Sequence, residues 1–495
     1  MTLKQIAVLG KKLVVFLALF EDCFKSRPAR DLLSIYVQGQ LSDVHRKTCE
    51  AIALEFDTAP RTLQRFLESI KWDEQKLRDR CQQIIASEHA HREAVGIIDE
   101  SGNAKSGTAT VGTGRQYNGN RGKVENCLVG VHTVFSAPGF QCLIDSNVYL
   151  TEDYANDPVR RKKNYVPEDV KFRTKTWIAI EQVLRALANG IRVWAWTFDE
   201  LYGRDSHFLD ALEAQHQRFV GEVPSDFRGW LEKPRVLRSP AKNARKKGRG
   251  KKYPRLSRKR PACEVRNLLR YSPVFREQRW QRYRIKDTDR GPCVWEVKWS
   301  VFWRKTAAGL PSRRHCLIVA RNVLTGEVKY FVSNRVPGEH GVTLRRLLQV
   351  AFRRWSVESC FREAKEELGL DHYEVRGWHC IHRHFYLTQL SHLFCARIRQ
   401  EYDPAENGSV ARLADEAEDA QPDRLTVEQV RSAMNVWLSS ADLPPSSRRA
   451  RYQKELDTQS YYQRRNWQSR KSHTKTRIER LLAIGIDPDR IKSTT

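Results

Sequence analysis

Two aspartates follow apolar segments of strand length. Residues 94–98 lead into Asp99, and residues 191–198 lead into Asp199. The end of a strand places a side chain at the rim of a sheet, where α/β proteins bind their ligands. A carboxylate there suits a hard divalent cation, because such cations prefer oxygen ligands. Phosphodiester cleavage uses two such cations about 3.5–4 Å apart, so a third carboxylate is expected on another element.

Glu358 is the candidate for this third carboxylate. It lies in a strongly helical segment from Thr343 to about Leu370, with Arg354 four residues before it and Lys365 seven after. On one continuous helix these spacings place the three side chains on a shared face. Cations fixed beside a metal-binding carboxylate are suited to a site where DNA phosphate binds next to metal ions. Taken alone, the spacing is more typical of an ordinary surface ladder of charged residues.

The charge of the chain favours a polyanionic partner. Its 495 residues contain 87 Lys and Arg against 59 Asp and Glu, a formal net charge of +28. Solubility is the alternative explanation, but the charge is clustered: residues 233–260 contain fourteen cations and no acid. Gly and Pro residues make stable secondary structure improbable there. We expect a mobile arm that contacts DNA phosphates, and its DNA-binding candidates are Lys246, Lys247, Arg249, Lys251 and Lys252.

Several other patterns exclude alternative functions. The eleven cysteines form no Cys-x-x-Cys pair, which favours reduced thiols in a cytosolic protein. The apolar segment near the start is interrupted by Lys11 and Lys12 and is too short to cross a membrane. The glycine-rich residues 102–122 lack a phosphate-loop ending, so nucleotide binding is not expected. One stretch contains several His and Cys residues whose spacing matches no zinc-binding pattern. We interpret its histidines as helix-packing or DNA-facing residues; the stretch comprises His372, His379, Cys380, His382 and His384.

The order of elements predicts an α/β protein. Residues 1 to about 90 are expected to be helical, either as a helix-turn-helix-like module or as a plain bundle. Strands are predicted at 94–98, 127–135 and 140–150, followed by a helix at 177–187 and a strand at 191–198. Beyond the basic segment, alternating Trp295, Trp299 and Trp303 favour the core face of a strand over base-stacking residues, with further strands at 316–320 and 328–332. The last hundred residues combine an acidic stretch at 415–423 with a basic helical tail at 464–480.

Three motifs, at residues 96–127, 197–203 and 354–376, together resemble one enzyme family. They contain Gly96-Ile97-Ile98-Asp99-Glu100-Ser101-Gly102, Thr197-Phe198-Asp199-Glu200-Leu201-Tyr202-Gly203, and Arg354-Trp355-Ser356-Val357-Glu358 followed by Phe361, Lys365 and residues 368–376. This pattern resembles the bacterial insertion-sequence transposases with a DDE site, in the insertion sequence 701 family. The resemblance runs from about residue 30 to residue 475. One departure is Ala351, where related elements carry a tyrosine.

The resemblance implies a multidomain α+β protein with a ribonuclease-H-like catalytic core. It implies that Asp99, Asp199 and Glu358 bind two Mg²⁺ ions, for which Mn²⁺ can substitute, and that Arg354 and Lys365 hold the transposon end. It also favours an approach of Arg115, Gln116 and Tyr117 to DNA over an ordinary turn, and Lys123 is a further DNA-binding candidate. The implied reaction cleaves the ends of the element and joins the freed 3′ ends to target DNA. The implied partners are terminal inverted repeats, target DNA and a second copy in a homodimeric synaptic complex, without a membrane.

The expected organisation has three parts. Residues 1–90 form a helical, DNA-binding domain; residues 91–395 form the catalytic domain; residues 396–495 form a helical basic region. Asp199 and Glu358 are 159 positions apart, and the resemblance implies that a β-rich insertion at about 220–340, with a basic linker at 233–261, fills this gap. The protein is expected in the bacterial cytoplasm, associated with the nucleoid. Two alternatives stay open: a catalytically inactive, transposase-derived DNA-binding protein, and a stand-alone metal nuclease that cleaves without joining.

Overall fold

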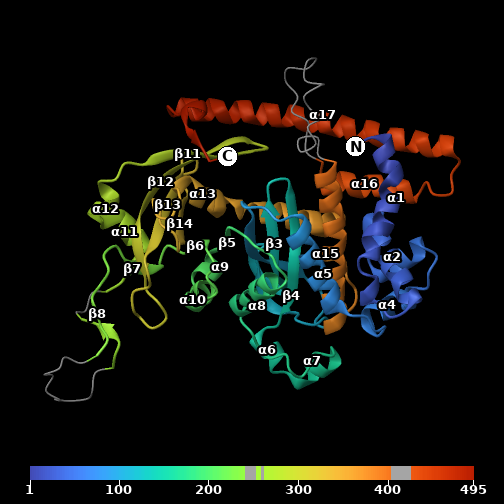
Figure 1. Ribbon diagram of the computed structural model, residues 1–495, viewed down its shortest axis with the longest axis horizontal. Helices are drawn as coiled ribbons and strands as arrows, with labels where there is room; N and C mark the ends of the chain where they lie inside the picture. The colour runs from blue at the N-terminus through green and yellow to red at the C-terminus, as the bar shows by residue number, and fades with distance from the viewer. Residues whose placement is uncertain (240–251, 258–260, 403–424, 495) are drawn as a thin grey trace. The chain divides into compact units, whose positions relative to one another are not determined.

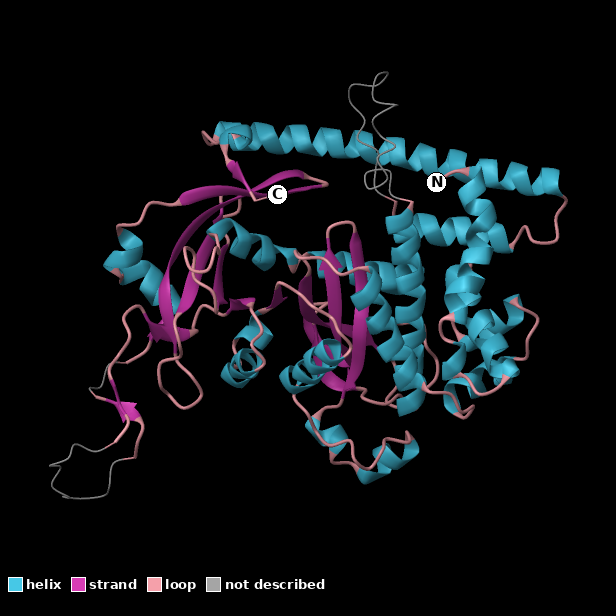
Figure 2. Ribbon diagram, in the orientation of Figure 1, coloured by secondary structure: helices cyan, strands magenta, loops and turns pink. Residues whose placement is uncertain are grey.

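The computed structural model describes residues 1–239, 252–257, 261–402 and 425–494 (Figure 1). The chain forms two compact units. The first contains Met1–Trp194 and Trp355–Trp467, and the second contains Ala195–Arg354 and Gln468–Thr495. Helices and sheets occur in both, as Figure 2 shows, which confirms the predicted mixed α/β class.

The sheet of the first unit is antiparallel. Its strands are β1 (Val95–Ala104), β2 (Gly114–Asn118), β3 (Lys123–Ala137) and β4 (Phe140–Tyr149). β3 pairs with β1 along most of its length and with β2 and β4 as well. The turn between β3 and β4 contains Gly139 at φ +71°, a left-handed conformation that glycine adopts without strain. Three of these strands were predicted; β2 was not.

The expected N-terminal helices are present and form a bundle. They are α1 (Leu3–Ala18), α2 (Arg27–Leu41), α3 (Cys49–Glu55), α4 (Pro60–Glu68) and α5 (Glu74–Glu88). The central helix of this bundle is α15 (Trp378–Glu401), against which α2, α4, α5 and α16 (Val427–Leu438) pack. The predicted helix at 177–187 is α8 (Lys175–Ala188), which packs on β3 and β4 and begins at its N-cap Thr174. Two short helices precede it, α6 (Glu152–Ala155) and α7 (Pro158–Lys163).

Helix α15 is buried although its sequence is rich in polar residues, because it covers the edge of the sheet. β4 pairs with β3 on one side, and α15 packs against it (Figure 1). The Val148 and Leu143 amides donate to His382 Nε2 (3.3 Å) and His392 Nδ1 (3.1 Å), while Gln389 Nε2 donates to the Ile144 carbonyl (2.7 Å). These bonds satisfy edge groups that would otherwise be unpaired. The helix-packing interpretation of His382 is therefore confirmed.

The second unit is built on a larger sheet. Its strand order is β10-β7-β12-β13-β14-β6, with β11 paired to β12 and β15 to β11. The main strands are β6 (Val220–Val223), β7 (Arg228–Trp230), β11 (Gln281–Thr288), β12 (Gly291–Arg304), β13 (His315–Asn322) and β14 (Val328–Ser333). The strands predicted around Trp299 and at 316–320 and 328–332 are confirmed. Shorter elements are β5 (Ala195–Phe198), α9 (Glu200–Gly203), α10 (Ser206–Ala214), β10 (Cys263–Glu264), α11 (Val265–Tyr271), α12 (Pro273–Arg276) and β15 (Lys492–Ser493).

Two predictions in this unit need correction. The tryptophan alternation does not give one continuous core face: Trp295 is buried, but Trp299 and Trp303 are only half-buried, while Phe302 and Arg304 on the other face are fully buried. The buried side of β12 thus changes along its length, because at its far end Phe302 contacts Phe227 and Arg304 pairs with Asp210 of α10. The basic segment was expected to lack secondary structure, yet β8 (Val236–Leu237) pairs with β9 (Arg255–Leu256).

The basic C-terminal tail is helical, as predicted. It belongs to α17 (Pro445–Ala483), whose residues are divided between the two units at Trp467. The acidic stretch 415–423 lies outside the described residues. In the described parts of the chain, no helix is both long enough and apolar enough to span a membrane.

Candidate active site

Asp99 lies inside a strand and not at its end. β1 continues to Ala104, so the prediction that the strand stops at Asp99 is wrong. What changes at this residue is burial: residues 95–98 are buried, whereas Asp99 and Glu100 are half-buried. The Asp99 carboxylate accepts a hydrogen bond from the Glu100 amide at 2.8 Å. The apolar run therefore marked one buried part of the strand, and its end marked the half-buried step at Asp99 and Glu100, beyond which Ser101 and Gly102 are buried again.

The strand register shows which way Asp99 faces. Asp99 is directly opposite His132 of β3, and residues opposite one another in an antiparallel pair project to the same face. The His132 ring contacts the rings of Phe361 and Phe385, with centroids 5.1 and 5.8 Å away. Phe361 belongs to α14 (Ser356–Arg362), the helix that carries Glu358. Asp99 thus projects to the sheet face that α14 covers.

Two contacts fix the segment that contains Glu358 along this face. At its start, Gln141 Nε2 of β4 donates to the Ser356 carbonyl at 2.8 Å. Gln141 lies opposite Ser136 of β3, which in turn lies opposite Val95 at the start of β1. Farther along, Lys365 Nζ donates to the Gly102 carbonyl of β1 at 3.4 Å. The segment therefore crosses the sheet from β4 toward β1. Along β1, Asp99 lies between Val95 and Gly102, the positions level with these two contacts. α14 therefore lies over the sheet face to which Asp99 projects, and Glu358 is exposed on this helix between the two anchors.

The helix predicted from 343 to 370 is not continuous. It consists of α13 (Leu344–Arg353), a turn at Arg354 and Trp355, α14, and a π-helix at Glu363–Glu367. The prediction of a single continuous helix is therefore wrong, whereas the shared face of Arg354, Glu358 and Lys365 stays a prediction. Arg354 and Trp355 keep right-handed helical dihedrals, and no Gly or Pro marks the break, so composition gave no signal. Within the second unit, Arg354 Nη2 lies 3.5 Å from Glu222 Oε2.

The π-helix is held by ion pairs from buried helices. Glu363 lies 3.5 Å from Arg399 and 3.6 Å from His392 of α15, and Glu367 lies 2.7 Å from Arg431 of α16. Lys365, between them, is directed to β1, and burial lowers the pKa of its ammonium group. Single π turns often occur at functional sites, where they redirect one side chain of a helix. Here the π turn directs Lys365 to the strand of Asp99.

Asp199 belongs to the second unit and follows β5 directly, as predicted. Its carboxylate is the N-cap of α9 and accepts the amides of Leu201 (3.0 Å) and Tyr202 (3.4 Å). The end of this turn requires glycine, because a Cβ on Gly203 would lie 1.9 Å from the Glu222 carbonyl oxygen of β6. The motif 197–203 therefore fixes the Asp199 carboxylate by a cap on one side and by close backbone packing on the other.

The carboxylates fit a hard cation by their chemistry. Asp99 and Glu358 offer oxygen ligands on a half-exposed sheet face, which suits Mg²⁺. Among the described residues, no three His, Cys, Asp or Glu side chains form a group that could hold a metal ion. Asp99 and Glu358 are the two members of the proposed set that belong to the first unit, one on β1 and the other on α14.

The DNA-binding candidates are mostly surface residues. Arg115 and Lys123 lie on β2 and β3 and are exposed, and Lys123 Nζ is 3.4 Å from Glu125. Lys252 is exposed beside β9, whereas Lys246, Lys247, Arg249 and Lys251 lie outside the described residues. Their contact with DNA stays a prediction. His132, which sequence reasoning missed, is the buried neighbour of Asp99; only the register of β1 on β3 could have identified it.

Comparisons with known proteins show the family to which the chain belongs. The model of the DDE superfamily endonucleases matches residues 19–292, and the chain belongs to this family. The match includes Asp99 and Asp199 and ends before Glu358. The chain is also similar to the probable transposase for insertion sequence element IS701 of Microchaete diplosiphon, with 29% identity over 193 residues. That alignment covers 38% of this chain and 47% of the relative, so the chain spans about half of the relative's length.

Proposed function

We propose that this protein is a DNA transposase that cleaves the ends of its own insertion sequence and joins the 3′ ends to target DNA. The observation that carries the proposal is the position of α14, the helix of Glu358, over the sheet face to which Asp99 projects, in a chain of the DDE superfamily endonucleases. The similarity to the IS701 relative supports transposition over other DNA cleavage. The catalytic core is proposed to be ribonuclease-H-like, with the sheet of the second unit as its insertion.

In this proposal each residue has a stated role. Asp99, Asp199 and Glu358 hold two Mg²⁺ ions, with Mn²⁺ as a substitute; the bound ions supply activation of the attacking oxygen and stabilisation of the leaving one. Lys365 orients a phosphate beside Asp99, and Arg354 contacts the same DNA end. Capping of α9 fixes the direction of the Asp199 carboxylate. Terminal inverted repeats are the specific substrate, and a homodimer brings two ends together.

The test uses labelled element ends with and without Mg²⁺, and scores nicked and joined products separately. Asp99→Asn and Glu358→Gln remove a charge while preserving shape, so each should abolish cleavage and retain DNA binding. Asp199→Asn is an informative third variant, because asparagine is as good an N-cap as aspartate. It should therefore lose cleavage without loss of thermal stability. Near-normal nicking by any of these variants would remove that residue from the site.

The same assay separates the alternatives. A transposase-derived DNA-binding protein would bind the ends and leave them intact with every metal. A stand-alone nuclease would nick DNA but never form joined products. Inverted repeats that flank the gene would favour the proposed transposase and would supply the substrate for the assay.

A further inference from the structure

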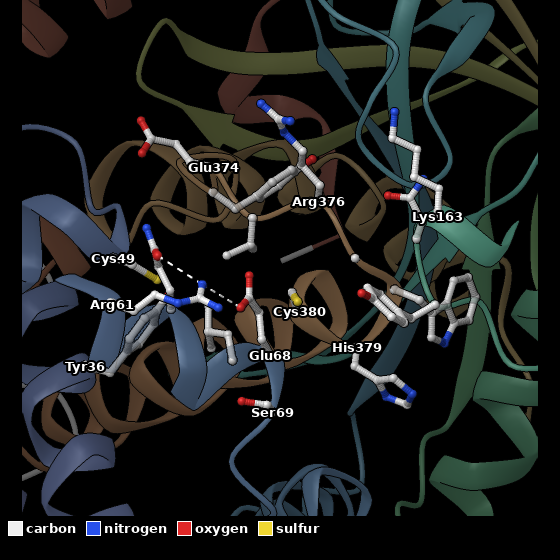
Figure 3. Close-up of a pocket in the computed structure, with 18 residues that line it drawn as sticks. Tyr36, Cys49, Arg61, Glu68, Ser69, Lys163, Glu374, Arg376, His379 and Cys380 are labelled. Atoms are coloured by element: carbon white, nitrogen blue, oxygen red, sulfur yellow. Dashed lines mark hydrogen bonds and ion pairs between the residues drawn. The ribbon is translucent and has the colours of Figure 1, made fainter. Parts of the chain in front are cut away.

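A cavity of about 710 Å³ lies wholly within the first unit (Figure 3). Three segments form its walls: α4, the turn that follows α7, and residues 373–380, which lead into α15. Figure 3 shows Arg61 and Lys163 on opposite sides of the cavity, with Glu68 and Cys380 between them. Its volume is in the range of sites that hold a small molecule. None of the carboxylates proposed for catalysis lines it.

Tyr165 is held in an unusual conformation at this cavity. Its φ is +52°, which is strained for a bulky residue, and its side chain is 77% exposed. The preceding Asn164 anchors the turn: its Nδ2 donates to the Tyr154 hydroxyl at 2.7 Å, and its carbonyl accepts the Trp378 amide at 2.9 Å. Backbone strain that the surroundings impose is concentrated at ligand sites. The fold therefore holds an aromatic ring out of the core at the entrance of a cavity.

A glycine lies beside this ring. Gly377 lines the cavity, and a Cβ placed on it would lie 3.9 Å from Tyr165 Cδ2 and 3.2 Å from Cys380 Sγ. Any larger residue at this position would enter the space beside the ring. An exposed aromatic ring next to an open cavity offers a stacking surface for a planar group.

The polar groups of the cavity match the remaining parts of a nucleotide. Lys163 and Arg376 are exposed cations suited to a phosphate. On α4, Arg61 Nη1 donates to Glu68 Oε2 at 2.9 Å and to Gln64 Oε1 at 3.3 Å, which fixes an amide and a carboxylate toward the cavity. Such groups read the edges of bases, whereas aromatic rings bind their faces. The cations, the amide and the carboxylate that line the cavity therefore suit a base attached to a phosphate better than an apolar ligand.

The cavity also lies close to the strand of Asp99. Tyr373 lines it, and the Tyr373 hydroxyl accepts a hydrogen bond from Asn103 Nδ2 at 3.2 Å. Asn103 is four residues beyond Asp99 on β1, roughly 13 Å along the strand. That length corresponds to a few nucleotides of one DNA strand. A nucleotide near a bond cleaved at Asp99 could therefore reach the cavity.

We propose that this cavity binds one unpaired nucleotide of the DNA end, with its base on Tyr165 and its phosphate near Lys163 and Arg376. The proposal rests on the proposed function, because it requires DNA at Asp99. Extrusion of a base costs less when its partner is missing, so the cavity should favour ends in which one nucleotide near the cleaved bond is already unpaired.

The experiment compares the affinity of the full-length protein for two DNA ends, one fully paired and one with a single unpaired nucleotide, moved through the positions near the cleaved bond. At one position, the wild type should bind the unpaired end more tightly, by about 5- to 100-fold if one base stacks on one ring. Tyr165→Asn should erase this difference, because asparagine tolerates positive φ but provides no ring. Tyr165→Phe should keep it, and Tyr271→Ala, at an exposed tyrosine of the second unit, is the matched control.

Several outcomes would overturn the inference. Equal affinity of the wild type for the two ends at all positions would do so, as would an unchanged preference in Tyr165→Asn. Tight binding of a free deoxynucleoside monophosphate, with no preference between the two DNA ends, would show that the site takes a free nucleotide instead. If the wild type cleaves the ends and shows no preference, the cavity proposal alone fails. If the preference is present but cleavage and joining are absent, the proposed function fails and the cavity proposal stands.

Discussion

Lys365 is the side chain with the clearest structural link to Asp99. Its ammonium donates to Gly102, and burial lowers its pKa, so the charge is held at an energetic cost. We expect Lys365→Ala to weaken binding of a cleaved DNA end by about 10- to 100-fold, the usual worth of a hydrogen bond to a charged group. Binding of unrelated duplex should change much less. Titration of both DNAs by fluorescence anisotropy checks this, with the exposed Lys475→Ala as control; equal losses for both DNAs would contradict it.

Gly203 shows how a single residue positions a carboxylate without contacting a substrate. An added Cβ would overlap the Glu222 carbonyl of β6, so Gly203→Ala must shift the turn that begins at Asp199. Overpacking of this kind typically costs about 1–3 kcal/mol. We expect a lower midpoint of thermal unfolding and a loss of cleavage that persists at temperatures where the variant is folded. Gly107→Ala, where a Cβ would meet open space, is the matched control and should retain stability and activity.

At the scale of elements, the contact between α15 and β4 should make stability depend on pH. Burial lowers the pKa of His382 to about 4, and the pKa values of His89 and His384 are also lowered to about 4. Between about pH 6.5, the usual value for histidine, and pH 4, the unfolded chain binds more protons than the folded one. The free energy of unfolding should therefore fall progressively as the pH falls through this window. Chemical denaturation at a series of pH values measures this fall.

His382→Gln tests the assignment. The glutamine can still accept the Val148 amide, but it does not titrate, so the decline with pH should be shallower than in the wild type. A reduction of stability by about 1–3 kcal/mol at pH 8 is also expected if the new side chain leaves a buried backbone group unpaired. His473→Gln, at an exposed position of α17, controls for the loss of a histidine. An unchanged slope in His382→Gln would show that the decline arises elsewhere.

Elements with a strong period could be predicted from sequence, whereas their interruptions could not. The apolar runs at residues 94–98 and 140–150 identified strands, because burial on the sheet requires continuous apolar side chains. The break at Arg354 and Trp355 carries no helix-breaking residue, and the π turn depends on ion pairs with Arg399 and Arg431, which are distant in sequence. Tertiary contacts such as these override local propensity.

The candidate site, too, could be predicted from the sequence only in part. The motifs indicated Asp99, Asp199 and Glu358, but not the direction of their side chains. That Asp99 shares a face with His132 follows from the strand register, and that α14 lies over this face follows from Gln141 and Lys365. The burial change along β12 likewise arises from contacts with distant residues, such as that of Arg304 with Asp210, which alternation of tryptophans could not reveal. Residue type thus predicted the chemistry, while long-range pairing determines which groups meet.

At the scale of the whole molecule, the net charge of +28 predicts binding to DNA of any sequence. The largest block of this charge, fourteen cations without an acid, lies at residues 233–260. Each phosphate that a cation neutralises releases counterions and steepens the dependence of affinity on salt. If this segment contributes mainly electrostatics, its effect should not depend on DNA sequence.

We therefore expect that replacing six of these cations with glutamine will lower affinity for specific and unrelated DNA about equally. The set is Lys242, Arg245, Lys246, Lys247, Arg249 and Lys251. The slope of log affinity against log salt should become less steep by up to about 5, since each phosphate contact contributes about 0.9. A variant with Lys and Arg exchanged at the same six positions keeps the charge and should keep the slope. A loss confined to the element's own ends, or shared by the exchanged variant, would instead mean that the segment reads DNA sequence; a large fall in melting temperature would mean that it supports the fold.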